Sequence, residues 1–292
     1  MASEAIFLNY DRETLDRQYI NQLHVPRFAE HVAFWQSESA RARAELPGHL
    51  DVPFGPSPDE ILDIFPPAAS AGQPAPVQVF FHGGYWRAFQ ARDFDFVARR
   101  LCEAGALVVI VNYALIPAVR MAELVRQCRA ALAWVGTNMA RYGGDPRRIY
   151  ISGHSAGGHL VAMLQAVATP AGEPEVAGSV RGGVAISGLY DLEPIRLTYL
   201  QETLQLTAAE VQAFSPERHL PAKAPPLVIG YGAAESEEFV RHATHYGRLL
   251  RERGIAVEVR PLAGHDHMSV CAALADRNSE PTQLILNQMG LR

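Results

Sequence analysis

The chain of 292 residues is long enough to bury one large hydrophobic core or two small ones. Apolar residues make up 48% of it and charged residues 20%, a balance that excludes global disorder. The net charge of −5 provides neither a basic field for nucleic acid nor a polybasic membrane anchor. We therefore expect a globular protein whose partner is a small-molecule substrate.

The sequence carries no signal for a membrane span or for secretion. Its longest apolar stretch, near Ala106–Val111, is far shorter than the roughly 20 residues that a membrane span needs. Residues 1–11 lack the basic and apolar regions of a secretion signal. The three cysteines, Cys102, Cys128 and Cys271, have no CxxC spacing, which argues against a disulfide framework or a zinc site. We expect a cytoplasmic protein, and a homodimer is left open.

The first 50 residues differ in character from the rest. Arg12–Gln22 and Val25–Leu46 are polar, rich in Arg, Glu and Gln, and helical in period, and Pro47 with Gly48 marks a stop. We interpret residues 1–50 as an N-terminal helical segment that packs near the functional site. Residues 51–292 then form the main domain.

From Val77 onward, short apolar runs alternate with helical patterns. The predicted strands are Val77–Phe81, Ala106–Val111, Arg148–Ser152, Val180–Ser187, Pro226–Gly230 and Ala256–Pro261. The predicted helices are Asp93–Ala104, Val119–Tyr142, Ala156–Ala168, Glu237–Arg253 and Pro281–Met289. This alternation predicts an α/β fold with a mainly parallel central sheet and helices on both faces. The Pro-punctuated stretch at about 190–223 breaks the alternation and predicts a small helical cap.

The pentapeptide Gly153-His154-Ser155-Ala156-Gly157 follows a predicted strand and opens a predicted helix. This G-x-S-x-G pattern in a strand–turn–helix context is typical of a nucleophile elbow. Its glycines allow a turn sharp enough to present a serine hydroxyl at the edge of the sheet. Ser155 is therefore the candidate nucleophile, and the alternative is a glycine-rich turn with an incidental serine.

A second motif, His82-Gly83-Gly84-Tyr85-Trp86, directly follows the strand Val77–Phe81. A hydrolytic serine needs N–H donors aimed at the developing oxyanion, and in this architecture they come from two loops. We expect the donors to be the backbone N–H groups of Gly84, Tyr85 and Ala156. His82 is expected to brace the loop. Together the two motifs predict serine-hydrolase chemistry.

A serine of ordinary pKa requires a histidine base and an orienting carboxylate later in the chain. The loop after the last predicted strand offers His265 and His267, and we favour His267 because it leads into the final helix. The loop after Pro226–Gly230 offers Glu235 as the acid. Asp191, one strand earlier, is the alternative acid.

The remaining histidines carry weaker signals. His242 and His245 lie three residues apart on a predicted helix, and we interpret them as surface histidines, since a metal site needs more ligands. His159, four residues beyond Ser155, is too far along its helix to be the base. No metal site is predicted.

Five motifs together resemble the arylformamidase (kynurenine formamidase) branch of the α/β-hydrolase superfamily, which lies beside the hormone-sensitive-lipase-like esterases. They are HGGYW at His82–Trp86, GHSAGGHL at Gly153–Leu160, SGLYDLEP at Ser187–Pro194, ESEEF at Glu235–Phe239 and DHM at Asp266–Met268. The resemblance places the nucleophile on Ser155, the acid on Glu235 and the base on His267. It implies cleavage of an amide, formamide or ester bond through an acyl-enzyme, with no metal or organic cofactor.

This sequence departs from the family pattern at three positions. The acid is usually aspartate and is Glu235 here. Gly158 stands where the family's GHSAGAHL pattern has alanine, in a variable position, and Met268 stands where a Phe often follows the base. These differences bear on the substrate, which in the family is N-formylkynurenine. An aromatic substrate is a further hypothesis, because Tyr85, Trp86 and Tyr190 are expected near the mouth of the pocket, with Trp86 and Tyr190 as substrate-binding residues. The alternative is that these aromatic residues pack the loops together.

Overall fold

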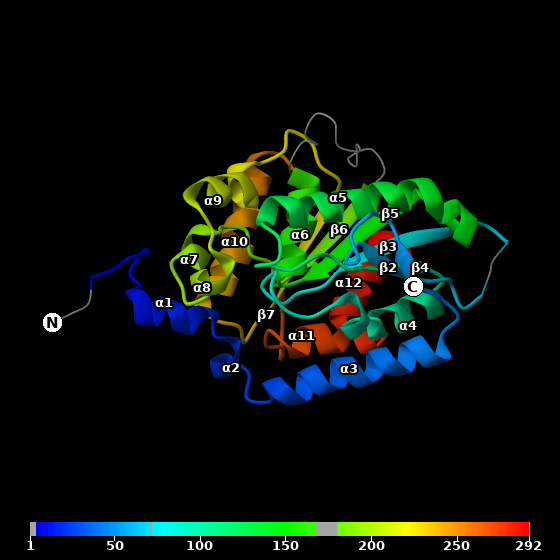
Figure 1. Cartoon of the computed structure of the whole chain (residues 1–292), viewed down its shortest axis with the longest axis horizontal. Helices are drawn as coiled ribbons and strands as arrows, with labels where there is room; N and C mark the ends of the chain where they lie inside the picture. The colour runs from blue at the N-terminus through cyan, green and yellow to red at the C-terminus, as the bar shows by residue number, and fades with distance from the viewer. Residues whose placement is uncertain (1–3, 70–71, 167–179, 292) are drawn as a thin grey trace.

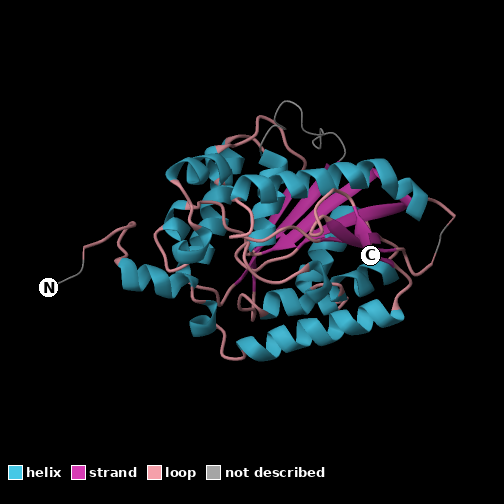
Figure 2. Cartoon of the chain, in the orientation of Figure 1, coloured by secondary structure: helices cyan, strands magenta, loops and turns pink. Residues whose placement is uncertain are grey.

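The computed structural model describes residues 4–69, 72–166 and 180–291. These residues form an eight-stranded sheet in the order β1-β2-β4-β3-β5-β6-β7-β8 (Figures 1 and 2). The strands are β1 His49–Pro53, β2 Ile61–Phe65, β3 Ala75–Phe81, β4 Leu107–Val111, β5 Gly144–His154, β6 Val180–Ile186, β7 Leu227–Gly232 and β8 Val257–Leu262. Along the described ranges, no helix combines the length and the apolar character needed to cross a membrane.

Strands β3 to β8 run parallel, whereas β2 pairs antiparallel with β4 and β1 pairs antiparallel with β2. All six predicted strands are present, and the predicted α/β fold with a mainly parallel sheet is confirmed. The sequence analysis missed β1 and β2. Four of the five residues of β1 are exposed, so this edge strand has no apolar run by which to recognise it.

The main helices are α3 Phe28–Glu45, α4 Phe96–Glu103, α5 Met121–Asn138, α6 Ala156–Ala166, α10 Glu237–Glu252, α11 Ser269–Ala272 and α12 Glu280–Met289. Figure 1 shows α5 and α6 over one face of the sheet and α3, α4, α11 and α12 over the other. This arrangement confirms the predicted helices on both faces of the sheet. Residues 167 and 168 of the predicted helix Ala156–Ala168 lie outside the described residues.

Alternating side chains of β3 supply both cores. Val77, Val79 and Phe81 lie in the cluster that contains α5, α6 and α10. Phe80 lies in the cluster that contains Trp35 of α3 and the apolar residues of α4 and α12. A strand directs successive side chains to opposite faces, so a continuous apolar run serves a sheet that is covered on both sides.

Three short α-helices and one 3-10 helix connect β6 to β7: α7 Glu193–Arg196, α8 Gln201–Leu204, α9 Ala208–Phe214 and η3 Pro216–Arg218. We call this segment the cap. Together with α10 and the N-terminal helices α1 Arg12–Tyr19 and α2 Asn21–His24, it lies at one end of the sheet (Figure 1). The start of α9 is fixed by a capping box in which the side chains of Thr207 and Glu210 satisfy each other's backbone N–H groups.

Candidate active site

Ser155 lies on the sharp turn between β5 and α6, with a φ of +57°. Residues other than glycine rarely adopt this left-handed conformation, and strain of this kind concentrates at functional sites. A Cβ on Gly157 would lie 1.9 Å from the carbonyl oxygen of Phe81, and one on Gly153 would lie 2.4 Å from the carbonyl oxygen of Gly157. Both positions therefore require glycine, and the turn raises the serine out of the sheet.

Three loops bring Ser155, His267 and Glu235 into one hydrogen-bonded line. His267 Nε2 lies 3.0 Å from Ser155 Oγ, and His267 Nδ1 lies 3.0 Å from Glu235 Oε2. The side chains of His267 and Glu235 are 4% and 0% exposed. The loops follow β5, β7 and β8, and parallel strands end at the same edge of a sheet, so residues far apart in sequence meet there.

The contacts of Glu235 decide which nitrogen of His267 carries the proton. A carboxylate accepts hydrogen bonds, so Nδ1–H donates to Glu235 and Nε2 is left to accept the hydroxyl proton of Ser155. The second oxygen of Glu235 accepts the hydroxyl of Ser187 and the N–H of Gly232, the latter at 2.7 Å. The sequence analysis missed Ser187, although its position after β6, the neighbour of β7, was a usable signal.

His154, the variable residue of the pentapeptide, holds the backbone of the histidine loop. Its Nε2 lies 2.8 Å from the carbonyl oxygen of His267. Burial, and to a smaller extent the electrostatic interaction with the His267 side chain, lower the pKa of His154 well below its usual range. The ring is therefore neutral, and Nε2–H donates to that carbonyl. No pattern in the sequence predicts this contact.

The loop after β3 packs directly against the elbow. A Cβ on Gly83 would lie 2.9 Å from the carbonyl oxygen of His154 and 3.1 Å from the Cβ of Ser155. Gly84 has a φ of +113° and Tyr85 a φ of +48°. Within the described residues, the N–H groups of Gly84 and Tyr85 have no hydrogen-bond acceptor. This loop therefore places unpaired donors beside the serine.

His82 lies under this loop rather than in the cavity. Its ring stacks on Tyr113, with ring centres 4.1 Å apart, and on Phe94, with ring centres 5.6 Å apart. Burial lowers the pKa of His82 to about 4, so the ring is neutral and Nδ1–H donates to the carbonyl of Gly83 at 2.8 Å. The predicted bracing role agrees with these contacts.

A cavity of about 160 Å³ opens at Ser155 and His267. Its aromatic wall comes from Phe28, Trp35, Tyr85, Phe89, Phe94 and Tyr199, and its other lining residues are Asn21, Gln22, Gly83, Gly84, Arg87, Ala88, His154 and Met268. An engineered protein cavity of about 150 Å³ holds a benzene molecule. The cavity thus has room for one aromatic ring next to the serine.

Of the three aromatic residues expected near the pocket mouth, Tyr85 lines this cavity, whereas Trp86 and Tyr190, the two expected to bind substrate, do not. Both are 0% exposed. The indole N–H of Trp86 donates to Nδ1 of His159 at 3.2 Å, and the ring of Tyr190 stacks on Tyr246 with ring centres 4.4 Å apart. The expectation was wrong because both rings are used to pack the loops. The N-terminal helices and the cap supply several of the aromatic residues instead.

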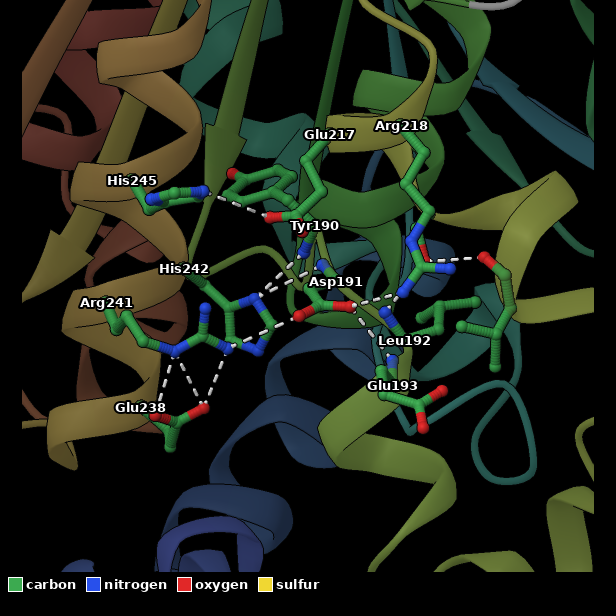
Figure 3. A network of polar contacts seen from close by, with 12 residues as sticks. Tyr190, Asp191, Leu192, Glu193, Glu217, Arg218, Glu238, Arg241, His242 and His245 are labelled. Carbon is green, nitrogen blue, oxygen red and sulfur yellow. Dashed lines mark hydrogen bonds and ion pairs between the residues drawn. The ribbon is translucent and has the colours of Figure 1, made fainter. Parts of the chain in front are cut away.

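Asp191, the alternative acid, belongs to a separate polar network (Figure 3). Its carboxylate lies 3.7 Å from Arg218 and 3.8 Å from Arg241, and it accepts the N–H of Glu193 at 3.0 Å. Of the two acids considered, only Glu235 contacts His267. Asp191 therefore anchors the start of the cap.

His242 lies in the same network, and its interpretation as a surface histidine was wrong. It is 1% exposed, and its Nδ1 accepts the N–H of Tyr190 at 3.1 Å (Figure 3). Its Nε2–H is then free to donate to the hydroxyl of Tyr19 at 3.0 Å. The face of α10 that carries His242 is covered by the cap and α1. The spacing of residues along one helix does not show which other elements cover it.

The other candidate base, His265, contributes its backbone: its carbonyl accepts the N–H of Ala234 at 3.0 Å. In the parts of the chain that the structure describes, no group of three or more His, Cys, Asp or Glu side chains is placed to hold a metal ion. At the cavity, a serine, a histidine and a carboxylate lie in one hydrogen-bonded line beside backbone donors.

A family model described as alpha/beta hydrolase fold matches residues 78–270. The chain belongs to the α/β-hydrolase family. Among its relatives in this family, the kynurenine formamidase of Danio rerio is 31% identical over 96% of this chain and 97% of its own length. The kynurenine formamidase of Salmo salar is 30% identical over 89% of this chain and 88% of its own.

A solved structure from Silicibacter sp. TM1040, described as a candidate thioesterase, is also similar. The two sequences are 28% identical, and the superposition covers 94% of this chain and 99% of the other, with a TM-score of 0.78. The family model and the two kynurenine formamidases confirm the family and the arylformamidase-like branch that the five motifs predicted, and the similarity covers nearly the whole chain.

Proposed function

We propose that this α/β-hydrolase cleaves the amide, formamide or ester bond of a small aromatic substrate, with Ser155 as nucleophile, His267 as base and Glu235 as acid. The observation that carries the proposal is the line of two 3.0 Å contacts from Ser155 Oγ through His267 to Glu235. Similarity to two kynurenine formamidases supports a formamide as the substrate.

The proposed reaction has two steps. Ser155 Oγ attacks the carbonyl carbon while His267 Nε2 takes its proton, and Glu235 stabilises the imidazolium that forms. The N–H groups of Gly84, Tyr85 and Ala156 stabilise the oxyanion. His267 then gives the proton to the departing amine or alcohol, which leaves an acyl-enzyme. A water molecule, activated by the same histidine, releases the acid and restores the serine.

Covalent labelling of Ser155 tests the proposal. A fluorophosphonate probe should label the wild type and leave Ser155→Ala unlabelled, because the probe requires an activated serine. Turnover of an aryl acetate by Ser155→Ala should fall to a residual rate about 10³–10⁴-fold above the uncatalysed rate. Substrate binding and the oxyanion donors account for this residual activity. Ser37→Ala replaces an exposed serine of α3 outside the catalytic loops, and this control variant should label normally. Equal labelling of wild type and Ser155→Ala would refute the assignment.

The second candidate is a generalist carboxylesterase, favoured by the similarity to the esterase LipQ of Mycobacterium tuberculosis, which is 29% identical over 70% of this chain and 53% of its own length. Comparing kcat/KM for N-formylkynurenine with that for short 4-nitrophenyl esters distinguishes the two. A formamidase should prefer the formamide despite its stronger bond, whereas a generalist should prefer the activated esters. A non-catalytic ligand-binding role would leave the fluorophosphonate probe unreacted.

We also infer that the protein works in the cytoplasm. Cys102, Cys128 and Cys271 are all unpaired and buried. Proteins of oxidising compartments more often use their cysteines in disulfides. Expression of a tagged protein followed by fractionation tests the location.

A further inference from the structure

The cavity has one arginine on its wall. Among the residues that line it, Arg87 is the only Arg, Lys, Asp or Glu; apart from His154 and His267, the others have uncharged side chains or are glycine. Arg87 follows the oxyanion loop by one residue, so its position is tied to the serine through the backbone. Any substrate that fills the cavity therefore meets a positive charge at a fixed place relative to the candidate nucleophile.

The guanidinium of Arg87 is held by the cap. Its Nη1 donates to the hydroxyl of Thr203 at 3.0 Å, and its Cζ lies 5.9 Å from the ring centre of Tyr199, over the ring. Tyr199 also lines the cavity, so these contacts hold the charged group at its mouth. Both contacts are to neutral groups, and they leave the positive charge uncompensated.

The hydrogen-bonding capacity of Arg87 is mostly unused. Arginine has five N–H donors, and the edge formed by Nε and Nη2 binds a carboxylate through two parallel bonds. Within the described residues, Nη1 makes the polar contact to Thr203, while Nε and Nη2 have no acceptor and no carboxylate forms an ion pair with the group. Many other arginines of the chain pair with Asp or Glu, as Arg120 does with Glu210 in the cap.

We propose that Arg87 binds a carboxylate of the substrate, so that the enzyme selects aryl esters or aryl amides that carry a carboxylate on the aromatic part. The aromatic wall takes the ring, Ser155 faces the scissile carbonyl, and the free edge of Arg87 binds the anion at the mouth. This inference rests on the hydrolytic function proposed for the same site. It makes Arg87 a specificity-determining residue and leaves the chemical step to the other groups.

A pair of substrates that differ only in charge tests the inference. We would compare kcat/KM for 4-acetoxyphenylacetate and for its carboxamide, whose ring, scissile ester and length are the same. The wild type should favour the carboxylate, and Arg87→Gln should lose about 10- to 100-fold in kcat/KM on it while changing little on the carboxamide. Arg87→Lys should lie between them, because it keeps the charge and lacks the two-pronged edge.

Arg92→Gln is the matched control, because Arg92 is an exposed arginine of the same loop region that does not line the cavity. It should leave the ratio between the two substrates at the wild-type value. The carboxylate preference of the wild type should also shrink as salt is raised, since the arginine is exposed.

Two outcomes separate this inference from the proposed function. If Ser155 is labelled and both acetates are hydrolysed, but Arg87→Gln leaves the ratio unchanged or lowers both rates equally, the role of Arg87 is refuted and the hydrolytic function stands. If the wild type hydrolyses neither acetate and Ser155 is not labelled, the hydrolytic function is refuted, and the role of Arg87 with it.

Discussion

The hydroxyl of Tyr85 donates a hydrogen bond of 2.9 Å to the main-chain carbonyl of Tyr19. Tyr199 of the cap donates to the same carbonyl at 3.2 Å. The preceding carbonyl, that of Gln18, accepts the hydroxyl of Ser236 at 2.7 Å, and Ser236 directly follows the candidate acid. Two consecutive carbonyls of the N-terminal segment therefore anchor the loop that carries the oxyanion donors and the loop that carries the acid.

Tyr85→Phe should lower kcat by about 10-fold with little change in KM, because a small displacement of an oxyanion donor weakens binding of the transition state more than binding of the substrate. Steady-state kinetics on an aryl acetate measure the two constants. Tyr199→Phe removes the other donor to the same carbonyl, but from the cap, and should act mainly on KM. An equal loss of kcat in both variants would contradict the special role of the Tyr85 contact.

Glu235→Gln should lower kcat by up to about 10⁴, because an amide in place of the carboxylate favours the wrong tautomer of His267, as in serine proteases. Ser187→Ala removes one hydrogen bond to the carboxylate and should cost far less, on the order of 10-fold. Asp191→Asn is the comparison: its neighbours are Arg218 and Arg241, so it should lower stability and leave kcat nearly unchanged. Loss of turnover in Asp191→Asn with activity retained in Glu235→Gln would reverse the assignment.

Gly157→Ala should destabilise the fold by about 3 kcal/mol, at the upper end of what overpacking costs. The added Cβ would lie 1.9 Å from the backbone oxygen of Phe81, which cannot move without breaking the sheet. Gly230→Ala is the matched control, because there the nearest atom is 3.2 Å away and belongs to the side chain of Leu262. Urea unfolding of the two variants measures the difference, and equal midpoints would show that the elbow tolerates a side chain.

The protein should lose stability as the pH falls from about 6.5 to about 4, in part through His82. The unfolded chain takes up a proton on this histidine near its ordinary pKa of about 6.5. The folded chain takes it up only near pH 4, because burial lowers the pKa of His82 to about 4. Protons therefore favour unfolding in that window, with a slope of up to about 1.4 kcal/mol per pH unit.

His82→Phe isolates this contribution, because phenylalanine preserves the stacking on Tyr113 and Phe94 and cannot take up a proton. The free energy of unfolding, measured in urea at several pH values, should fall less steeply in the variant than in the wild type between pH 6.5 and 4. Other buried groups titrate equally in both proteins and cancel in the comparison. Parallel curves would mean that His82 does not titrate as its burial requires.

The sequence by itself determined the fold class, the elbow and the order of the site residues. These features are local: the apolar strand before Ser155, the glycines on either side of it and the HGGYW loop each require particular residues over a few positions. His267 was favoured over His265 because it leads into the following helix, and Glu235 was favoured over Asp191 because it comes in the loop after the next strand. The pairing of His267 and Glu235 seen in the structure agrees with both choices.

Only the tertiary structure decided what surrounds these residues. Trp86 and Tyr190 are aromatic residues next to motifs, and nothing in their local sequence says whether they face a cavity or a core. The support that Ser187 and His154 give to the acid and base loops depends on strands and loops that meet at one edge of the sheet. The contact between Tyr19 and Tyr85 spans 66 residues, and it forms because α1 packs against α10 and is hydrogen-bonded to the cap through Asp16 and Tyr199.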